Sequence, residues 1–238
     1  MSQKYIHLSP RLACALSMLE GFETVADIGC DHGRLTAALL QQNNCRHVIA
    51  SDISEPSLKK AEELIRYIGL SDRVSVRCGN GLTVLKPNEC DAIAILGMGG
   101  TLMAQLLSSA SEPLKGVKCI VLQPMRAQAD IRKYLYENAY WITDDRVIEE
   151  HGRFYQLFRA IPNTKRQPWP SRFPAGFFDV GYQSYIQEDR NLIRLCQAQL
   201  QQHMQQLKRA FGTDGEQKLT ERIAALNQII NAITEKDI

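Results

Sequence analysis

The chain has 238 residues, 45% of them hydrophobic, which is enough for one folded domain with an appendage and excludes a disordered protein. Its 28 Lys and Arg residues against 26 Asp and Glu leave a net charge of +2, so no global basic excess indicates a nucleic-acid partner, and any such partner needs a local patch. Seven scattered cysteines without a C-x-x-C pair argue against a disulfide framework or a metal site. No apolar run approaches the roughly 18 residues of a membrane span. We therefore expect a cytoplasmic protein with reduced thiols.

Strand and helix patterns alternate through the N-terminal part of the chain. Ser9 as N-cap and Pro10 as first helical residue predict a leading amphipathic helix. Short apolar runs then predict five strands, TVADIG, RHVIASD, RVSVRCG, DAIAILG and KCIVLQP, with helices beginning near Arg34, Glu55, Gly100 and Arg126. Such alternation predicts a Rossmann-like α/β fold, a mostly parallel sheet with helices on both faces and its ligand crevice at the carboxyl ends of the strands.

A strand pair and a helical tail complete the predicted organisation. The runs 141–150 and 153–161, joined by His151-Gly152, predict a hairpin that brings the sheet to seven strands and favours a methyltransferase over most nucleotide-binding folds. The stretch 162–176 holds four prolines and is predicted to be a linker. Two antiparallel helices are expected beyond it, with apolar stripes formed by Leu192, Cys196, Leu200 and Leu207, then by Leu219, Ile223, Leu226, Ile230 and Ile233.

The stretch VADIGCDHGRL follows the first predicted strand and resembles a nucleotide-binding loop. Asp27, Gly29 and Gly33 fit such a loop, but Asp31 replaces its middle glycine. At the end of the second strand, Asp52 is placed to bind both hydroxyls of a ribose. These features predict a cofactor of the adenosine type.

Two further turns add to the predicted site. In CGNGL, Asn80 lies between Gly79 and Gly81, where an amide is able to bond the adenine edge while the glycines let the backbone approach. The fourth strand ends in LGMGG, residues 96–100, whose missing side chains make room for a flat acceptor ring. The residue types alone leave plain alternatives open, namely a glycine turn, a helix-capping Asp52, and an N-cap at Asp31 beside a satisfied His32.

Several segments together resemble the bacterial tRNA adenine-22 N1-methyltransferase family over residues 8–160: LSPRL, VADIGCDHGRL, CGNGL, ILGMGG, VLQP and EEHGRFYQL. The unusual pieces occur in the right order at strand ends, which makes the resemblance specific. It implies a methyltransferase domain over residues 1–164 and a small helical domain, an antiparallel coiled coil, over residues 165–238. It also implies S-adenosylmethionine as methyl donor and N1 of a tRNA adenine as acceptor.

The resemblance also implies a role for individual residues, with Asp31 as the catalytic candidate. The residues implied for the cofactor are Asp27, Gly29, Cys30, Asp31, Asp52, Ile53, Gly79, Asn80, Gly81, Gly97 and Met98. Those implied for the substrate are Arg11, Gly99, Gly100, Gln123, Arg126 and Tyr155. The chain departs from the family pattern at Gly33-Arg34-Leu35-Thr36, where Ala-Tyr-Leu-Pro is common, at Met125, where Asn is usual, and at Gln156, where an acid is frequent.

The chemistry of adenine N1 requires no general base, because its in-plane lone pair attacks the sulfonium methyl group directly. Asp31 would instead accept a hydrogen bond from the exocyclic amine and stabilise the developing positive charge. An extruded base also demands a cationic surface for the surrounding RNA. The candidates are Arg11, Arg34, Arg126, Lys165, Arg166, Arg172, Lys208 and Arg209.

Alternatives from other classes remain at this point. They are a methyltransferase that acts on a small molecule and a catalytically silent tRNA-binding protein. A nicotinamide-dependent dehydrogenase is a weaker rival, because the middle loop position is acidic. The helical tail also suits a dimer contact, which leaves the oligomeric state open.

Overall fold

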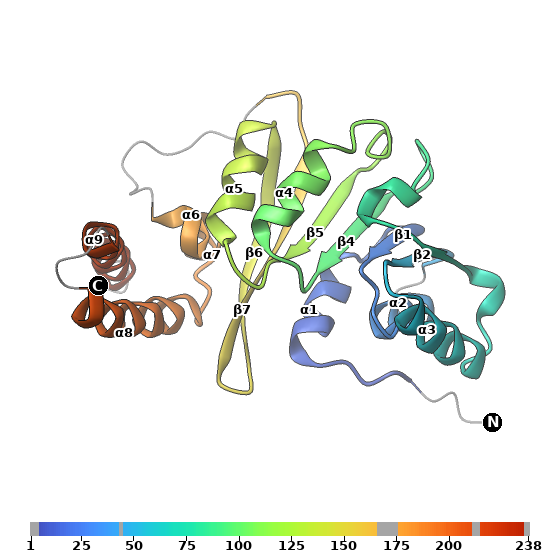
Figure 1. The fold of residues 1–238 in the computed structure, drawn as a ribbon, viewed down its shortest axis with the longest axis horizontal. Helices are drawn as coiled ribbons and strands as arrows, with labels where there is room; N and C mark the ends of the chain where they lie inside the picture. Colours follow the sequence, from blue (N-terminus) through green and yellow to red (C-terminus); the bar gives the residue numbers. More distant parts are fainter. Residues whose placement is uncertain (1–4, 43–44, 166–175, 211–214, 236–238) are drawn as a thin grey trace.

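The computed structural model describes residues 5–42, 45–165, 176–210 and 215–235. It contains a seven-stranded sheet with helices on both faces, and a helical tail beyond one edge (Figure 1). The strand order is β3-β2-β1-β4-β5-β7-β6. The strands are β1 (Thr24–Ile28), β2 (His47–Asp52), β3 (Val74–Cys78), β4 (Ala92–Leu96), β5 (Cys119–Gln123), β6 (Tyr140–Glu150) and β7 (Arg153–Pro162).

The first five strands are parallel, and the β6–β7 hairpin adds the antiparallel pair, which confirms the predicted Rossmann-like fold. The helices of this unit are α1 (Pro10–Met18), α2 (Arg34–Gln42), α3 (Glu55–Tyr67), α4 (Gly100–Ser108) and α5 (Gln128–Glu137), with short 3-10 helices η1 (Ser71–Arg73) and η2 (Gly81–Val84). The tail consists of α6 (Phe177–Val180), α7 (Tyr182–Ile186), α8 (Leu192–Ala210) and α9 (Gly215–Thr234).

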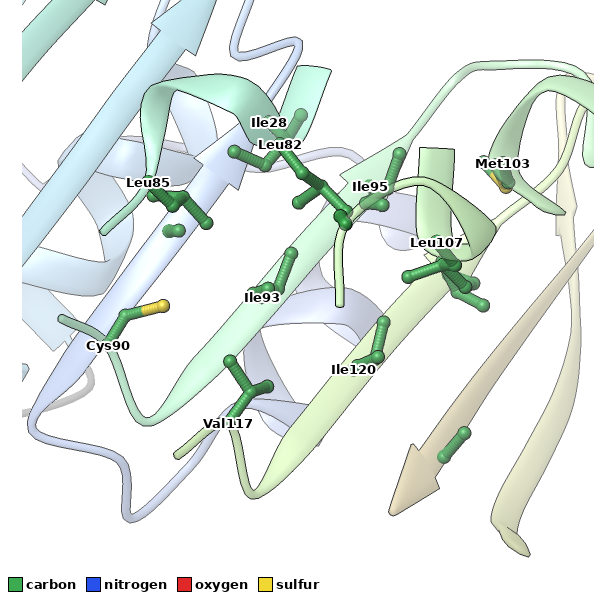
Figure 2. Packing of buried hydrophobic residues seen from close by; sticks show 14 of the residues in the cluster. Ile28, Leu82, Leu85, Cys90, Ile93, Ile95, Met103, Leu107, Val117 and Ile120 are labelled. Carbon is green, nitrogen blue, oxygen red and sulfur yellow. The ribbon is translucent and has the colours of Figure 1, made fainter. Parts of the chain in front are cut away.

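The hydrophobic core occupies both faces of the sheet because helices cover both. Along β4, Ile93 and Ile95 point toward α4 and α5, whereas Ala92 and Ala94 point toward the layer that contains α1 and α2. Figure 2 shows the first of these faces, where isoleucines of the strands pack against Met103 and Leu107 of α4. The sheet is thereby fixed, and the carboxyl ends of β1, β2, β3 and β4 are held at one edge.

The start of α5 differs from the sequence expectation. The helix begins at Gln128 rather than near Arg126, because Ala127 adopts a left-handed conformation with φ of 55° that an α-helix does not accommodate. The other predicted helix starts are confirmed, including Pro10 after Ser9, although the Ser9 side chain makes no capping hydrogen bond. The hairpin turn at His151 and Gly152 is also confirmed, with φ of 51° and 72° as a tight two-residue turn requires.

The tail is joined to the sheet through a buried ion pair. The Arg132 guanidinium on α5 donates to both carboxylate oxygens of Asp145 on β6, at 3.1 and 2.9 Å, and to the Phe178 carbonyl at 3.0 Å. Ser184 of α7 donates to the Asp145 carbonyl at 2.9 Å. Apolar side chains of α6 to α9 pack around Val147 of β6.

Helices α8 and α9 pack against each other, but their buried residues are confined to the first turns of α8 and the second half of α9. The coiled-coil arrangement therefore stays a prediction. The linker prediction falls largely on residues 166–175, which lie outside the described residues. This range includes Arg166 and Arg172, two of the cations predicted for RNA. Among the helices that the structure describes, none has the length and apolar content needed to cross a bilayer.

Candidate active site

A cavity of about 560 Å³ opens at the carboxyl ends of β1, β2, β3 and β4, a volume in the usual range for small-molecule sites. Every residue that the sequence predicted for the cofactor lines it: Asp27, Gly29, Cys30, Asp31, Asp52, Ile53, Gly79, Asn80, Gly81, Gly97 and Met98. The topology explains this convergence, since the carboxyl ends of parallel strands meet at one edge of a sheet. Their individual roles stay predictions.

The turn after β1 is held against β2 by its backbone. The amides of Gly29 and Cys30 both donate to the Ser51 carbonyl, at 2.8 and 2.9 Å. Gly29 has φ of 75°, and a Cβ at this position would collide with the end of the Met98 side chain. Glycine therefore lets Met98 from the β4 turn close over the β1 turn, which joins two walls of the cavity.

Asp27 is the buried carboxyl group of the cavity, with only 3% of the residue exposed. Burial raises its pKa from 3.8 to about 6, against hydrogen bonds from Thr36 that lower it. The Thr36 hydroxyl on α2 donates to Oδ2 of Asp27 at 2.7 Å. A carboxylate held in this way suits a positively charged ligand group, because such a group compensates the cost of burial.

Asp52 is fixed by two backbone amides, from Asp31 to Oδ2 at 3.0 Å and from Ser54 to Oδ1 at 2.9 Å. Each carboxylate oxygen retains acceptor capacity, so ribose hydroxyls are still able to donate to it. Ile53 follows with 72% of its surface exposed, an apolar side chain beside a polar one. The N-cap of α3 is Ser54, so helix capping does not explain Asp52.

Asp31 has an unusual backbone and an accessible side chain. Its φ of 49° is left-handed, a conformation that Asp tolerates better than most residues. Its side chain is 71% exposed, and Oδ1 lies 3.4 Å from the His32 Nε2 and accepts a hydrogen bond from the Ser57 hydroxyl at 3.4 Å. These long contacts leave the carboxylate free to receive a stronger donor. Asp31 does not cap α2, which begins at Arg34.

Three of the residues predicted for the substrate, Arg11, Gln123 and Tyr155, form a cluster, and of these three Arg11 lines the cavity. Its Nη1 donates to the Gln123 side chain at 2.6 Å, and its guanidinium lies 5.1 Å from the centre of the Tyr155 ring. The Nε atom of Arg11 is buried without a hydrogen-bond partner in the described part of the chain. Gln123 and Tyr155 thus determine where the Arg11 guanidinium lies.

Gly99, Gly100 and Arg126 meet beside the cavity rather than in its lining. Gly99 and Arg126 form an isolated parallel bridge, and the Gly100 amide donates to the Arg126 carbonyl at 2.8 Å. A Cβ at Gly100 would collide with the Ala127 carbonyl. Glycine is therefore required at position 100 for the close approach of two loops, whatever its part in substrate binding.

Several residues of the site were not predicted from the sequence, among them Leu102, Leu106 and Thr36. Leu102 and Leu106, one turn apart on α4, line the cavity. Two leucines four residues apart, directly after the glycines of the β4 turn, lie on one face of the helix, and this pattern could have predicted them. Thr36, a fully buried polar residue in the first turn of α2, contributes its hydrogen bond to Asp27. Burial raises the pKa of the Cys30 thiol, which therefore stays protonated and is not a nucleophile. Among the described residues, no group of three or more His, Cys, Asp or Glu side chains is arranged to hold a metal ion.

Comparison with known proteins agrees with this geometry. A family model for a methyltransferase domain matches residues 8–158. The tRNA (adenine(22)-N(1))-methyltransferase of Bacillus subtilis is 30% identical over 235 residues, which cover 95% of this chain and 98% of that protein. The chain belongs to the tRNA (adenine(22)-N(1))-methyltransferase family. This confirms the resemblance on which the predicted roles rest.

Solved structures show the same fold over nearly the whole chain, the tail included. The crystal structure of the B. subtilis m1A22 tRNA methyltransferase TrmK has a TM-score of 0.83 at 28% identity and covers 94% of this chain and 99% of that one. A Streptococcus pneumoniae putative tRNA (m1A22) methyltransferase in complex with S-adenosyl-L-methionine has a TM-score of 0.83 at 22% identity, with 94% and 100% covered. The helical tail therefore accompanies the methyltransferase unit in this family.

Proposed function

We propose that this protein transfers a methyl group from S-adenosylmethionine to N1 of adenine 22 in the D-arm region of tRNA. The observation that carries the proposal is the cavity at the strand ends, which gathers all the residues predicted for the cofactor and borders the Arg11 cluster. Membership of the family supports the same reaction.

The cavity residues fit S-adenosylmethionine chemically. Asp27 offers a buried carboxylate to the ammonium group, Asp52 offers acceptors to the ribose, and the exposed Ile53 offers apolar contact. Asn80 would bond the adenine edge. When bound, the cofactor supplies an electrophilic sulfonium methyl group.

Asp31 is the residue that we assign to the acceptor base. Its exposed carboxylate would accept a hydrogen bond from the exocyclic amine of adenine, orient the ring and stabilise the charge that develops on it. Because adenine N1 carries no proton, Asp31 does not act as a base. Arg11, Gln123 and Tyr155 would form the other side of the acceptor position.

We propose that tRNA binds through exposed cations near the cavity and on the tail. Arg34 lines the cavity and Arg126 lies beside it, and both are exposed, whereas Lys165, Lys208 and Arg209 are exposed elsewhere on the chain. We also propose a methyltransferase domain at residues 1–164, a helical tRNA-binding domain at 165–238 and a cytoplasmic location, where tRNA is found.

The tRNA role of the tail is tested by charge reversal, because removal of the tail from Pro168 onward would also uncover Arg132, Asp145 and Val147. We expect Lys208→Glu with Arg209→Glu to weaken tRNA binding roughly tenfold and to reduce its salt dependence, without changing the affinity for S-adenosylmethionine. Lys115→Glu, before the amino end of β5 and so away from the cavity, is the control. Equal tRNA affinity in both variants would contradict a tRNA-binding tail.

The reaction is tested by incubating the protein with S-adenosylmethionine and unmodified bacterial tRNA, followed by nucleoside mass spectrometry and mapping of the reverse-transcription stop. We expect N1-methyladenosine at a single D-arm position. Methylation of small molecules without RNA would favour a different acceptor, and tRNA binding without a methylated product would indicate a silent binding protein.

A further inference from the structure

The β6–β7 hairpin extends beyond the part of the sheet that supports it (Figure 1). β5 pairs with β7 only at Phe158, Arg159 and Ala160. Residues 147–156, the tip of the hairpin, therefore form a two-stranded ladder that no third strand in the described part of the chain extends. A two-stranded hairpin without further support is marginally stable in water. Its tip therefore depends on side-chain contacts at its two faces.

The two faces of the tip meet different parts of the molecule. Glu149 and its cross-strand partner Phe154 lie on one face, and Ile148 and Tyr155, the neighbouring pair, lie on the other. Phe154 packs in the apolar cluster of the tail, whereas Ile148 and Tyr155 pack in the cluster that contains α1. The tip is thus sandwiched between the tail and α1.

An arginine contacts each face. On the tail side, Arg194 of α8 binds both carboxylate oxygens of Glu149, at 2.5 and 3.0 Å, and lies 5.6 Å from the centre of the Phe154 ring. On the α1 side, the Arg11 amide donates to Glu150 at 3.1 Å, and its guanidinium lies over Tyr155. Arg11 in turn lines the cavity and donates a hydrogen bond to the Gln123 side chain.

We propose that Arg194 is a positioning residue for methyl transfer, which clamps the hairpin tip from the tail so that Tyr155 and Glu150 hold Arg11 in place at the acceptor side of the cavity. This inference rests on the proposed function, which assigns the Arg11 side to the acceptor base. A planar guanidinium with two parallel hydrogen bonds fixes an angle as well as a distance, and a lysine does not reproduce that geometry. The tail accordingly contributes to the chemistry without touching the reacting atoms.

The test compares Arg194→Ala, Glu149→Gln, the charge swap Arg194→Glu with Glu149→Arg, and Arg190→Ala, which removes an exposed arginine of the same tail. Four quantities are measured: the single-turnover methylation rate, the dissociation constants for S-adenosylmethionine and for tRNA, and amide hydrogen exchange of residues 147–156. We expect Arg194→Ala and Glu149→Gln to speed exchange in the tip and to slow methylation about tenfold, with both dissociation constants within about twofold of wild type.

The charge swap separates this role from direct RNA binding. It re-forms the pair with reversed polarity, so we expect exchange protection and the methylation rate to return to within about threefold of wild type. Arg190→Ala should match wild type throughout. The proposal is overturned if the swap stays slow, or if Glu149→Gln matches wild type while Arg194→Ala weakens tRNA binding. A wild-type protein that fails to methylate tRNA would contradict the proposed function, whereas a normal wild-type rate that Arg194→Ala leaves unchanged would contradict the positioning role.

Discussion

Two aspartates, Asp27 in the cavity and Asp145 at the junction with the tail, are buried to a similar extent but have different neighbours. Burial raises the pKa of each carboxyl group to about 6. At Asp145, the Arg132 guanidinium binds both carboxylate oxygens and, together with a hydrogen bond from Ser184, lowers the pKa against the effect of burial. Among the described residues, Asp27 receives its hydrogen bonds from Thr36 alone.

The difference separates a structural charge from a functional one. At the junction, the fold supplies the counter-charge itself, so the ion pair is complete without a ligand. In the cavity the carboxylate is oriented but not neutralised, and the cost of its burial is offset only when a cation arrives. Substitutions at the two positions should therefore change different quantities, stability at the junction and cofactor affinity in the cavity.

The largest expected effect is at the junction. Asp145→Ala leaves the buried Arg132 guanidinium unpaired and should lower the free energy of unfolding by about 3 to 5 kcal/mol, as measured by urea denaturation. The double variant Arg132→Met with Asp145→Leu removes both charges and should recover most of that loss. Similar stability of Asp145→Ala and wild type would show that the ion pair does not hold the tail.

In the cavity, Asp31→Asn is expected to act on the reaction and not on the fold. It should slow single-turnover methylation about a hundredfold, because a neutral amide stabilises the charge on the adenine far less. The melting temperature should stay close to wild type, since the Asp31 side chain is largely exposed, and the dissociation constant for S-adenosylmethionine should change less than the methylation rate. An unchanged rate would remove Asp31 from the catalytic role.

The sequence was sufficient to predict the strands, the cavity and its polar residues, because these depend on short motifs at strand ends whose meeting point the parallel sheet dictates. It was not sufficient to predict the pairs Thr36–Asp27, Arg132–Asp145 and Arg194–Glu149. Each of these joins two elements whose relative placement is set by packing of the whole fold. The two-residue error at the start of α5 has a local cause, the left-handed Ala127, which an alanine gives no reason to expect.

The pH dependence of cofactor binding sharpens the contrast at Asp27. Since its pKa is about 6 in the free protein, the dissociation constant for S-adenosylmethionine should rise up to about tenfold per pH unit below pH 6, measured by calorimetry. Lower pH should weaken cofactor binding through Asp27 but favour folding. Between about pH 4 and 6 the Asp27 carboxyl group is protonated more often in the folded chain than in the unfolded one, so its contribution to the free energy of unfolding increases as pH falls. Asp27→Asn should abolish the contribution of this site to the pH dependence of both cofactor affinity and stability. The neighbouring carboxyl groups of Asp31 and Asp52 remain in that variant. A flat pH profile in the wild-type protein would contradict an ammonium contact at Asp27.

The smallest expected effect isolates a single hydroxyl group. Thr36→Val keeps the shape of the side chain but removes the donor to Asp27, so the pKa of that carboxyl should rise further and the affinity for S-adenosylmethionine at pH 7 should fall roughly fivefold. Thr36→Ser retains the hydroxyl and should follow the wild-type pH profile. Methylthioadenosine, which lacks the ammonium group, should bind wild type and Thr36→Val equally. If Thr36→Val weakened both ligands alike, the hydroxyl would be acting on the shape of the cavity, and Asp27 would need no orienting partner beyond the packing around β1.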